Sequence, residues 1–171
     1  MNNGKPRDPA SPPLEYSTVL GSADFAEAAL QVVGCARHQL ALLSVDLERN
    51  LFGTDAFTAR LRTFILAHRR AQLRVLVHDP AAALRNSIRL VEFGRLISSR
   101  IEFRAMPEER RKRREEFLIA DERALLYRSA PDQIEAKHYP DAPMVARSHL
   151  REFDALWQES TVAREMSSLG F

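Results

Sequence analysis

The alternation of apolar runs and amphipathic stretches predicts strands and helices in turn. Residues 40–45 (LALLSV) and 73–78 (LRVLVH) are short, nearly unbroken apolar runs, which are typical of strands covered on both faces. Residues 101–104 alternate apolar with charged side chains, so we expect a third strand nearer the sheet edge. Strands joined through helices in this order imply right-handed crossovers and a parallel sheet core. The intervening helices are expected at residues 22–34, 54–65 and 80–97.

The pattern changes after the third predicted strand. Phe117–Ala120 and Ala124–Tyr127 are short apolar runs separated by three charged residues, the spacing of an antiparallel hairpin. A proline-containing loop then leads to a last amphipathic helix around residues 150–157. We therefore predict an α/β fold with a mixed, mainly parallel sheet flanked by helices on both faces. The expected organisation is a flexible tail over residues 1–14, one domain over 15–160 and a C-terminal tail over 161–171.

Composition narrows the class of protein. A chain of 171 residues with 45% hydrophobic residues can fill one sizeable core. The net charge is only +2, from 25 Lys and Arg against 23 Asp and Glu, so charge alone does not argue for nucleic acid binding. Cys35 is the single cysteine, and the sequence shows neither a signal-peptide pattern nor an apolar run long enough to span a bilayer. We therefore expect a cytoplasmic protein with no membrane segment.

A run of charges precedes the predicted hairpin. Residues 108–116 (EERRKRREE) hold five consecutive cations, Arg110 to Arg114, between two pairs of glutamates. This run could contact an anion or nucleic acid, or it could be a solvated loop in which the glutamates cancel most of the field. It contains no aromatic residue on which bases could stack. The sequence leaves both interpretations open.

The histidines lack the paired spacing of a zinc site, and we expect neither a metal nor a cofactor. His78 ends a predicted buried strand beside Asp79, at the carboxyl edge where open parallel sheets bind their ligands. A lone histidine there could equally satisfy a neighbouring carbonyl. His138 follows Lys137 in a predicted loop and is a candidate phosphate contact or a surface residue. Asp46, just after the first predicted strand, is expected to reach the same edge in a capping or loop role.

The segment Arg113–Ser129 (RREEFLIADERALLYRS) resembles the signature strand pair of the phospholipase D superfamily. That signature is His-x-Lys-x4-Asp, followed by a strand, a turn, a second strand and a Gly-Ser step. Asp121 and Ser129 match the family's aspartate and serine, whereas Arg114 stands at the histidine and Glu116 at the lysine.

The resemblance to phospholipase D extends from about residue 22 to residue 160 and implies a single phospholipase D-like half-domain. The chain also resembles uncharacterised bacterial domains, degenerate relatives of phospholipase D, that often follow an acetyltransferase domain. The segments that carry this second likeness are residues 46–54 (DLERNLFGT) and 76–85 (LVHDPAAALR).

The two replacements are incompatible with the family's chemistry. In the family a histidine attacks phosphorus while lysines neutralise phosphate oxygens. Arg114 offers donors only and cannot be a nucleophile, and Glu116 puts a negative charge where a phosphate should bind. The family also pairs two motifs, which a half-domain can achieve only as a homodimer. The resemblance therefore implies a pseudoenzyme that forms a homodimer.

We interpret the protein as a non-catalytic module that binds an anionic ligand or a protein partner, with nucleic acid as a weaker option. The residues expected to hold an anion are Arg114, Arg128, Lys137 and His138. The alternative is a phosphodiester hydrolase, of nuclease or phospholipase type, whose nucleophile has moved to His78 or His138.

Overall fold

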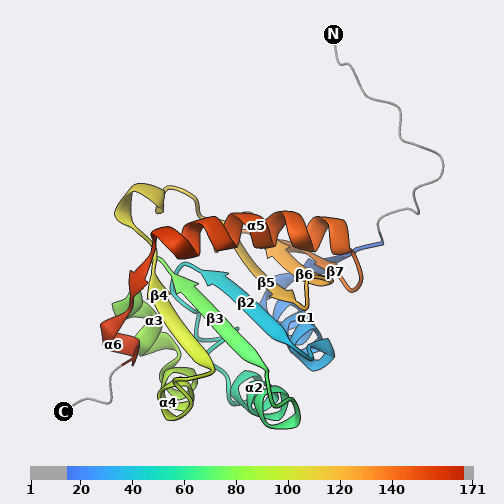
Figure 1. The fold of residues 1–171 in the computed structure, drawn as a ribbon. Helices are drawn as coiled ribbons and strands as arrows, with labels where there is room; N and C mark the ends of the chain where they lie inside the picture. Colours follow the sequence, from blue (N-terminus) through green and yellow to red (C-terminus); the bar gives the residue numbers. More distant parts are fainter. Residues whose placement is uncertain (1–14, 168–171) are drawn as a thin grey trace.

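A single mixed sheet runs through residues 15–167, the part of the chain that the computed structural model describes (Figure 1). Its strands are β1 (Ser17–Leu20), β2 (Gln39–Ser44), β3 (Gln72–Val77), β4 (Ile101–Ala105), β5 (Glu116–Ala120), β6 (Ala124–Arg128), β7 (Glu135–Tyr139) and β8 (Thr161–Val162). Their order across the sheet is β1-β7-β6-β5-β2-β3-β4-β8.

The prediction of a mainly parallel sheet is only partly right. Only β2, β3 and β4 pair in parallel, because helical crossovers join these three strands. The strands β1, β7, β6 and β5 pair antiparallel with their neighbours, and β8 is antiparallel to β4. The predicted β5–β6 hairpin is confirmed, with Ile119 opposite Leu125. Short connections join β5 to β6 and β6 to β7, and short connections favour antiparallel pairing.

Helices cover both faces of the sheet, as predicted. In Figure 1, α5 crosses one face, while α1, α2, α3 and α4 lie against the other. Two apolar clusters fill the spaces between the sheet and these two helix layers. The helices are α1 (Gly21–Cys35), α2 (Asp55–Ala67), α3 (Pro80–Asn86), α4 (Ile88–Leu96), α5 (Pro143–Glu159) and α6 (Arg164–Ser167), with a 3-10 turn at Glu108–Arg110.

The helix predicted over residues 80–97 is divided into α3 and α4 at Ser87. The Ser87 hydroxyl is buried and donates to the Leu47 carbonyl at 2.9 Å. This bond anchors the loop after β2 to the helix junction. The start of α3 follows the predicted signal, because Asp79 accepts a bond from the Ala82 amide at 3.0 Å and Pro80 occupies the first turn.

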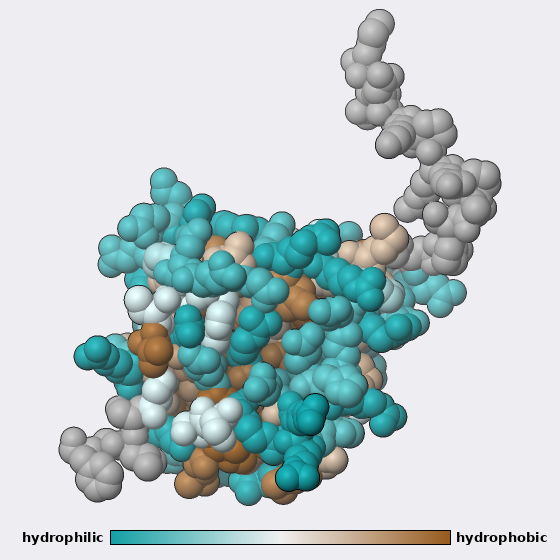
Figure 2. All heavy atoms as spheres, in the orientation of Figure 1, coloured by the Kyte–Doolittle hydropathy of each residue, from teal (hydrophilic) through white to brown (hydrophobic). Residues whose placement is uncertain are grey.

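Part of the segment expected as a C-terminal tail is folded. Residues 161–167 form β8 and α6, and Met166 is fully buried against the main core. Residues 168–171 and the predicted tail over residues 1–14 lie outside the described residues. No helix within residues 15–167 is both long enough and apolar enough to cross a membrane. In the view of Figure 2, polar side chains cover most of the surface.

Candidate functional site

Polar side chains meet at the carboxyl edge of the parallel strands. The strand β2 ends at Ser44, and the antiparallel strand β5 begins beside it at Glu116. Across the hairpin, Glu116 lies directly opposite Arg128 at the end of β6. Ser44, Glu116 and Arg128 are therefore brought to one end of the sheet, and all three are buried.

Glu116 is fully enclosed and forms the centre of this network. Its carboxylate accepts bonds from the Ser44 hydroxyl at 2.8 Å, the Val45 amide at 2.9 Å and Nε of Arg128 at 2.8 Å. Nη2 of Arg128 also approaches it to 2.5 Å. The position that matches the family's lysine thus holds a carboxylate directed into the protein, with its charge balanced by a guanidinium.

Arg128 is committed to partners inside the fold. Besides Glu116, its Nη2 bonds to Glu48 at 3.0 Å, and its guanidinium lies 4.8 Å from the centre of the Phe25 ring. Only 6% of Arg128 is exposed. Asp46 lies near this network, and its pKa is raised by burial and by the negative charges of Glu116 and Glu48. The buried Oδ1 atom of Asp46 has no hydrogen-bond partner among residues 15–167.

His78 lies just beyond β3 at the same edge. It is 5% exposed, and its Nε2 has no hydrogen-bond partner within the described chain. Burial, followed by the positive charges of Arg114 and Arg111, lowers the pKa of His78 to about 4. The imidazole is therefore neutral at pH 7. Arg114 is thus near enough for its charge to affect the ionisation of His78. Asp79, the residue after His78, is the N-cap of α3.

The basic run before β5 is neutralised in part. Arg110 makes two bonds to the carboxylate of Glu159, at 2.8 and 3.0 Å, and Arg113 pairs with Glu152 at 2.8 Å. Within residues 15–167, Lys112 and Arg114 form no ion pair. Two of the five cations are thus bound to α5. The positive charges that act on His78 come from Arg114 and Arg111, and neither forms an ion pair within residues 15–167.

The four residues expected to hold an anion do not converge. Lys137 and His138 are consecutive on β7, so their side chains point to opposite faces of the sheet. Nζ of Lys137 lies 5.3 Å from the centre of the Tyr16 ring, whereas His138 is buried and its pKa is lowered by that burial. Arg128 is paired internally, and of the four residues Arg114 is the one whose charge contributes to the lowered pKa of His78.

Asp121 lies at the opposite end of β5 and binds the backbone. Its carboxylate accepts bonds from the amides of Arg37, His38 and Gln39 at 2.7, 2.8 and 2.9 Å. The residue adopts a left-handed conformation with φ 52°, which aspartate tolerates better than most residues do. Asp121 therefore fastens the hairpin turn to the start of β2. Ser129, the other residue that matches the signature, is exposed just after β6.

Sequence reasoning missed Ser44 and the pairing of Glu116 with Arg128. The pairing has a readable signal, because a hairpin that places Ala120 opposite Ala124 must place Glu116 opposite Arg128. The bond from Ser44 depends on β2 pairing with β5, which local patterns do not reveal. No cluster of three or more His, Cys, Asp or Glu side chains in residues 15–167 could hold a metal ion.

The sequence matches a known family model over most of its length. The model of a family described as "Domain of unknown function (DUF7931)" matches residues 21–169. No curated protein matches the sequence.

Several solved structures share the fold at low sequence identity. TrmBL2, an archaeal chromatin protein described as showing a novel mode of DNA binding, has a TM-score of 0.63 and 13% identity over 90% of this chain. The chain spans 56% of the length of that protein. Nuc from Salmonella typhimurium, a phospholipase D family member, has a TM-score of 0.61 and 14% identity, covering 86% of this chain and 98% of Nuc.

A phosphatidylserine synthase from Haemophilus influenzae gives a TM-score of 0.60 with 10% identity, covering 90% of this chain and 41% of the synthase. At these identities the likeness concerns the fold. The architecture is phospholipase D-like, and the chemistry must be argued from the residues present.

Proposed function

Because the chain belongs to the DUF7931 family and shares the phospholipase D-like fold, we propose that it is a non-catalytic module that binds an anion at the carboxyl edge of its sheet. The observation that carries this proposal is the buried bond between Glu116 and Arg128 at 2.8 Å. It occupies the position where the family's lysine would contact phosphate.

The absence of catalysis follows from the groups at the two motif positions. A displacement at phosphorus needs a nucleophile and cations that stabilise the developing negative charge. The Arg114 guanidinium offers hydrogen-bond donors only, and the Glu116 carboxylate is enclosed and already accepts three bonds. Arg114 therefore cannot replace the nucleophilic imidazole, and Glu116 cannot replace the ammonium group that would neutralise a phosphate oxygen.

Anion binding is supported by the groups beside the network. Arg114 forms no ion pair in the described chain, and Nε2 of His78 has no partner there. An anion between them would accept a charge-assisted bond from the guanidinium and a second bond from the imidazole. Because the anion favours the charged imidazole, binding would raise the pKa of His78 from about 4. The affinity should therefore increase as the pH falls from 7 to 5.

Inorganic phosphate, titrated by NMR at pH 7 and pH 5, tests this site. We expect saturable shifts of the amides around His78 and Arg114, with tighter binding at pH 5. Arg114→Met should weaken phosphate binding roughly tenfold, the usual effect of losing a charge-assisted bond. Lys112→Met is the matched control, because Lys112 is an exposed cation of the same run and does not contribute to the pKa shift of His78. If the two variants lose the same amount of phosphate affinity, the binding reflects general surface charge and contradicts a specific site at Arg114.

A phosphodiester hydrolase remains the second candidate, with His78 as the nucleophile, because its imidazole is neutral at pH 7 and Nε2 has no partner among the described residues. Incubation with bis(p-nitrophenyl) phosphate separates the two functions. The binding module should give no turnover between pH 5 and 8. Turnover that disappears in His78→Gln would establish the hydrolase and overturn the non-catalytic assignment.

The proposed assembly is a homodimer, as the family resemblance implies, and the proposed location is the cytoplasm, as the single cysteine and the sequence pattern favour. Two copies would be needed to bring two carboxyl edges together, and each of these edges would carry an Arg114 that forms no ion pair in the described chain. An anion with several phosphates, such as nucleic acid, or an acidic protein partner would then meet two equivalent sites.

A further inference from the structure

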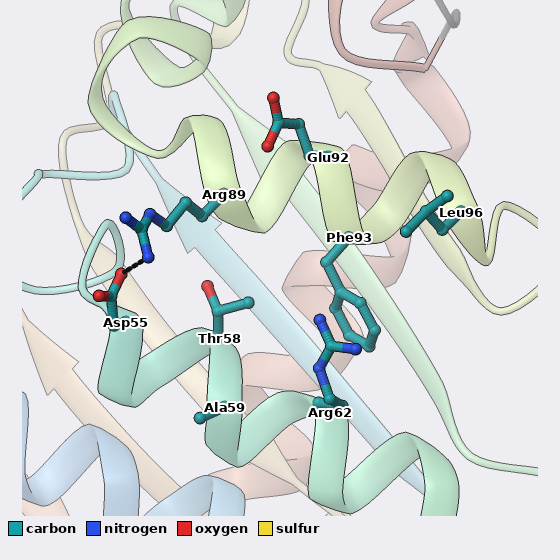
Figure 3. A pocket seen from close by; sticks show the side chains of 8 residues that line it. All are labelled: Asp55, Thr58, Ala59, Arg62, Arg89, Glu92, Phe93 and Leu96. Carbon is teal, nitrogen blue, oxygen red and sulfur yellow. Dashed lines mark ion pairs between the residues drawn. The ribbon is translucent and has the colours of Figure 1, made fainter.

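A groove lies between α2 and α4, and none of the residues that line it belongs to the network at the carboxyl edge of the sheet. This surface groove of about 540 Å³ separates these helices (Figure 3). This volume lies within the usual range for small-molecule sites. Two facing helical stripes line it, Asp55, Thr58, Ala59 and Arg62 from α2 and Arg89, Glu92, Phe93 and Leu96 from α4.

The wall contributed by α2 contains an unsatisfied hydroxyl group. Thr58 is only 8% exposed, and its Oγ1 has no hydrogen-bond partner within residues 15–167. A threonine in a helix can return its hydroxyl bond to the carbonyl one turn earlier, but Thr58 does not. A buried hydroxyl without a partner costs stability, so a ligand that bonds to it would recover that loss.

The charges in the groove differ in how they are satisfied. At one end, Arg89 pairs with Asp55 at 2.6 Å. Arg62 stands one turn after Thr58 and has no ion pair in the described chain, and its guanidinium is held 4.9 Å from the centre of the Phe93 ring. Figure 3 shows Glu92 directed away from α2. Arg62 is therefore the cation of the groove that lacks an ion pair among the described residues, and its guanidinium lies against the Phe93 ring.

These features define the chemistry of the ligand. One guanidinium with parallel donors suits a single carboxylate, which can take bidentate bonds. A phosphate monoester would bring nearly two negative charges into a groove that also contains Asp55. Leu96, which is 75% exposed, and the methyl group of Ala59 offer apolar surface for the body of the molecule.

We propose that the α2–α4 groove binds a small organic monocarboxylate with an apolar body. The carboxylate pairs with Arg62 and accepts the bond of the Thr58 hydroxyl, while the apolar body lies on Leu96. No residue of this site belongs to the network at the carboxyl edge of the sheet, so this proposal does not depend on anion binding there.

Benzoate serves as the probe, and its binding is followed by NMR on the intact chain. Saturable shifts of the amides in α2 and α4 are expected below about 10 mM benzoate. Arg62→Met should weaken binding at least tenfold, and the matched control Arg60→Met, on the same helix but outside the groove, should leave it within twofold. Neutral benzamide, which has the same shape, should bind at least tenfold more weakly than benzoate.

Thr58→Val provides a second readout that does not depend on charge. It should weaken benzoate binding roughly fivefold, because one hydroxyl bond is lost. It should also raise the Tm of the unliganded protein by about 2 to 4 °C, because it removes an unpaired buried hydroxyl. Thr63→Val, on the exposed side of α2, is the control for both measurements.

Three results would overturn the proposal: no saturable shifts up to about 10 mM benzoate, equal losses in Arg62→Met and Arg60→Met, or binding of benzamide as tight as that of benzoate. Binding of benzoate to Thr58→Val with wild-type affinity would likewise exclude the hydroxyl from the site.

Discussion

His78 is buried as a neutral imidazole, and its protonation is therefore coupled to folding. Its pKa falls from 6.5 to about 4 in the native state, so between these two values the unfolded chain binds more protons than the folded chain. The free energy of unfolding should therefore decrease as the pH falls from 6.5 to 4. A shift of this size corresponds to about 3 kcal/mol.

Urea unfolding at pH 7 and pH 4 measures this effect, and His78→Gln should remove most of the difference between the two pH values. His138, whose pKa is also lowered by burial, should account for part of what remains. If His78→Gln retains the full wild-type pH dependence, the imidazole is not the group that titrates.

The buried Glu116 carboxylate should contribute strongly to the stability of the fold. Glu116→Gln leaves the buried Arg128 short of its main counter-charge, so we expect a loss of about 3 to 5 kcal/mol in the free energy of unfolding. Glu48→Gln is the control, because the Glu48 side chain is 34% exposed and Arg128 keeps Glu116 as a partner. The control should cost less than about 1 kcal/mol. Similar losses in the two variants, measured by urea unfolding, would contradict the central role given to Glu116.

At the scale of elements, Asp121 ties the β5–β6 turn to the segment between α1 and β2. In Asp121→Asn, the amide NH2 cannot accept a bond, so at least one of the three backbone amides loses its partner. We expect a loss of about 1 to 3 kcal/mol. Hydrogen exchange of the Arg37, His38 and Gln39 amides should accelerate.

Glu122→Gln is the matched control for Asp121→Asn. Glu122 follows in the same turn, with φ 58°, and makes only an exposed ion pair with Arg147 at 3.5 Å. It should change the stability by no more than about 0.5 kcal/mol. Faster exchange of the same three amides in Glu122→Gln would indicate that the turn as a whole, rather than the Asp121 carboxylate, holds the segment.

The elements that the sequence predicts best are those with strong local patterns. The buried runs that became β2 and β3 and the hairpin of β5 and β6 were predicted because each is apolar and bounded by polar residues. The strand β7, with the sequence EAKHY, is too polar to be recognised and forms because it pairs with both β6 and β1. The division between α3 and α4 also depends on a distant contact, from Ser87 to Leu47.

At the scale of the whole molecule, the sequence predicts a candidate site at the carboxyl edge of the sheet, but it does not predict how the charged side chains there pair with one another. The carboxyl edge follows from strand order, so His78 was a candidate from sequence alone. The charge balance there depends on which side chains face inward. Arg128 turned toward Glu116 and Glu48, so it is not available to an external anion. Such choices reflect packing across several elements, which local sequence patterns do not determine.

The predicted homodimer is also tested at this scale. Sedimentation velocity at about 50 μM, a concentration far above the Kd of a stable dimer, should give twice the 19.4 kDa mass of one chain. A single species at the mass of one chain would contradict the dimer, while anion binding by the monomer could still be measured with phosphate.

The three backbone bonds that Asp121 accepts stabilise the fold far from the candidate site. They secure the frame at the end of β5 remote from the edge where reacting groups would stand, using only main-chain amides as partners. Because these bonds involve none of the side chains at the carboxyl edge, substitutions at that edge should leave the β5–β6 turn attached to the start of β2.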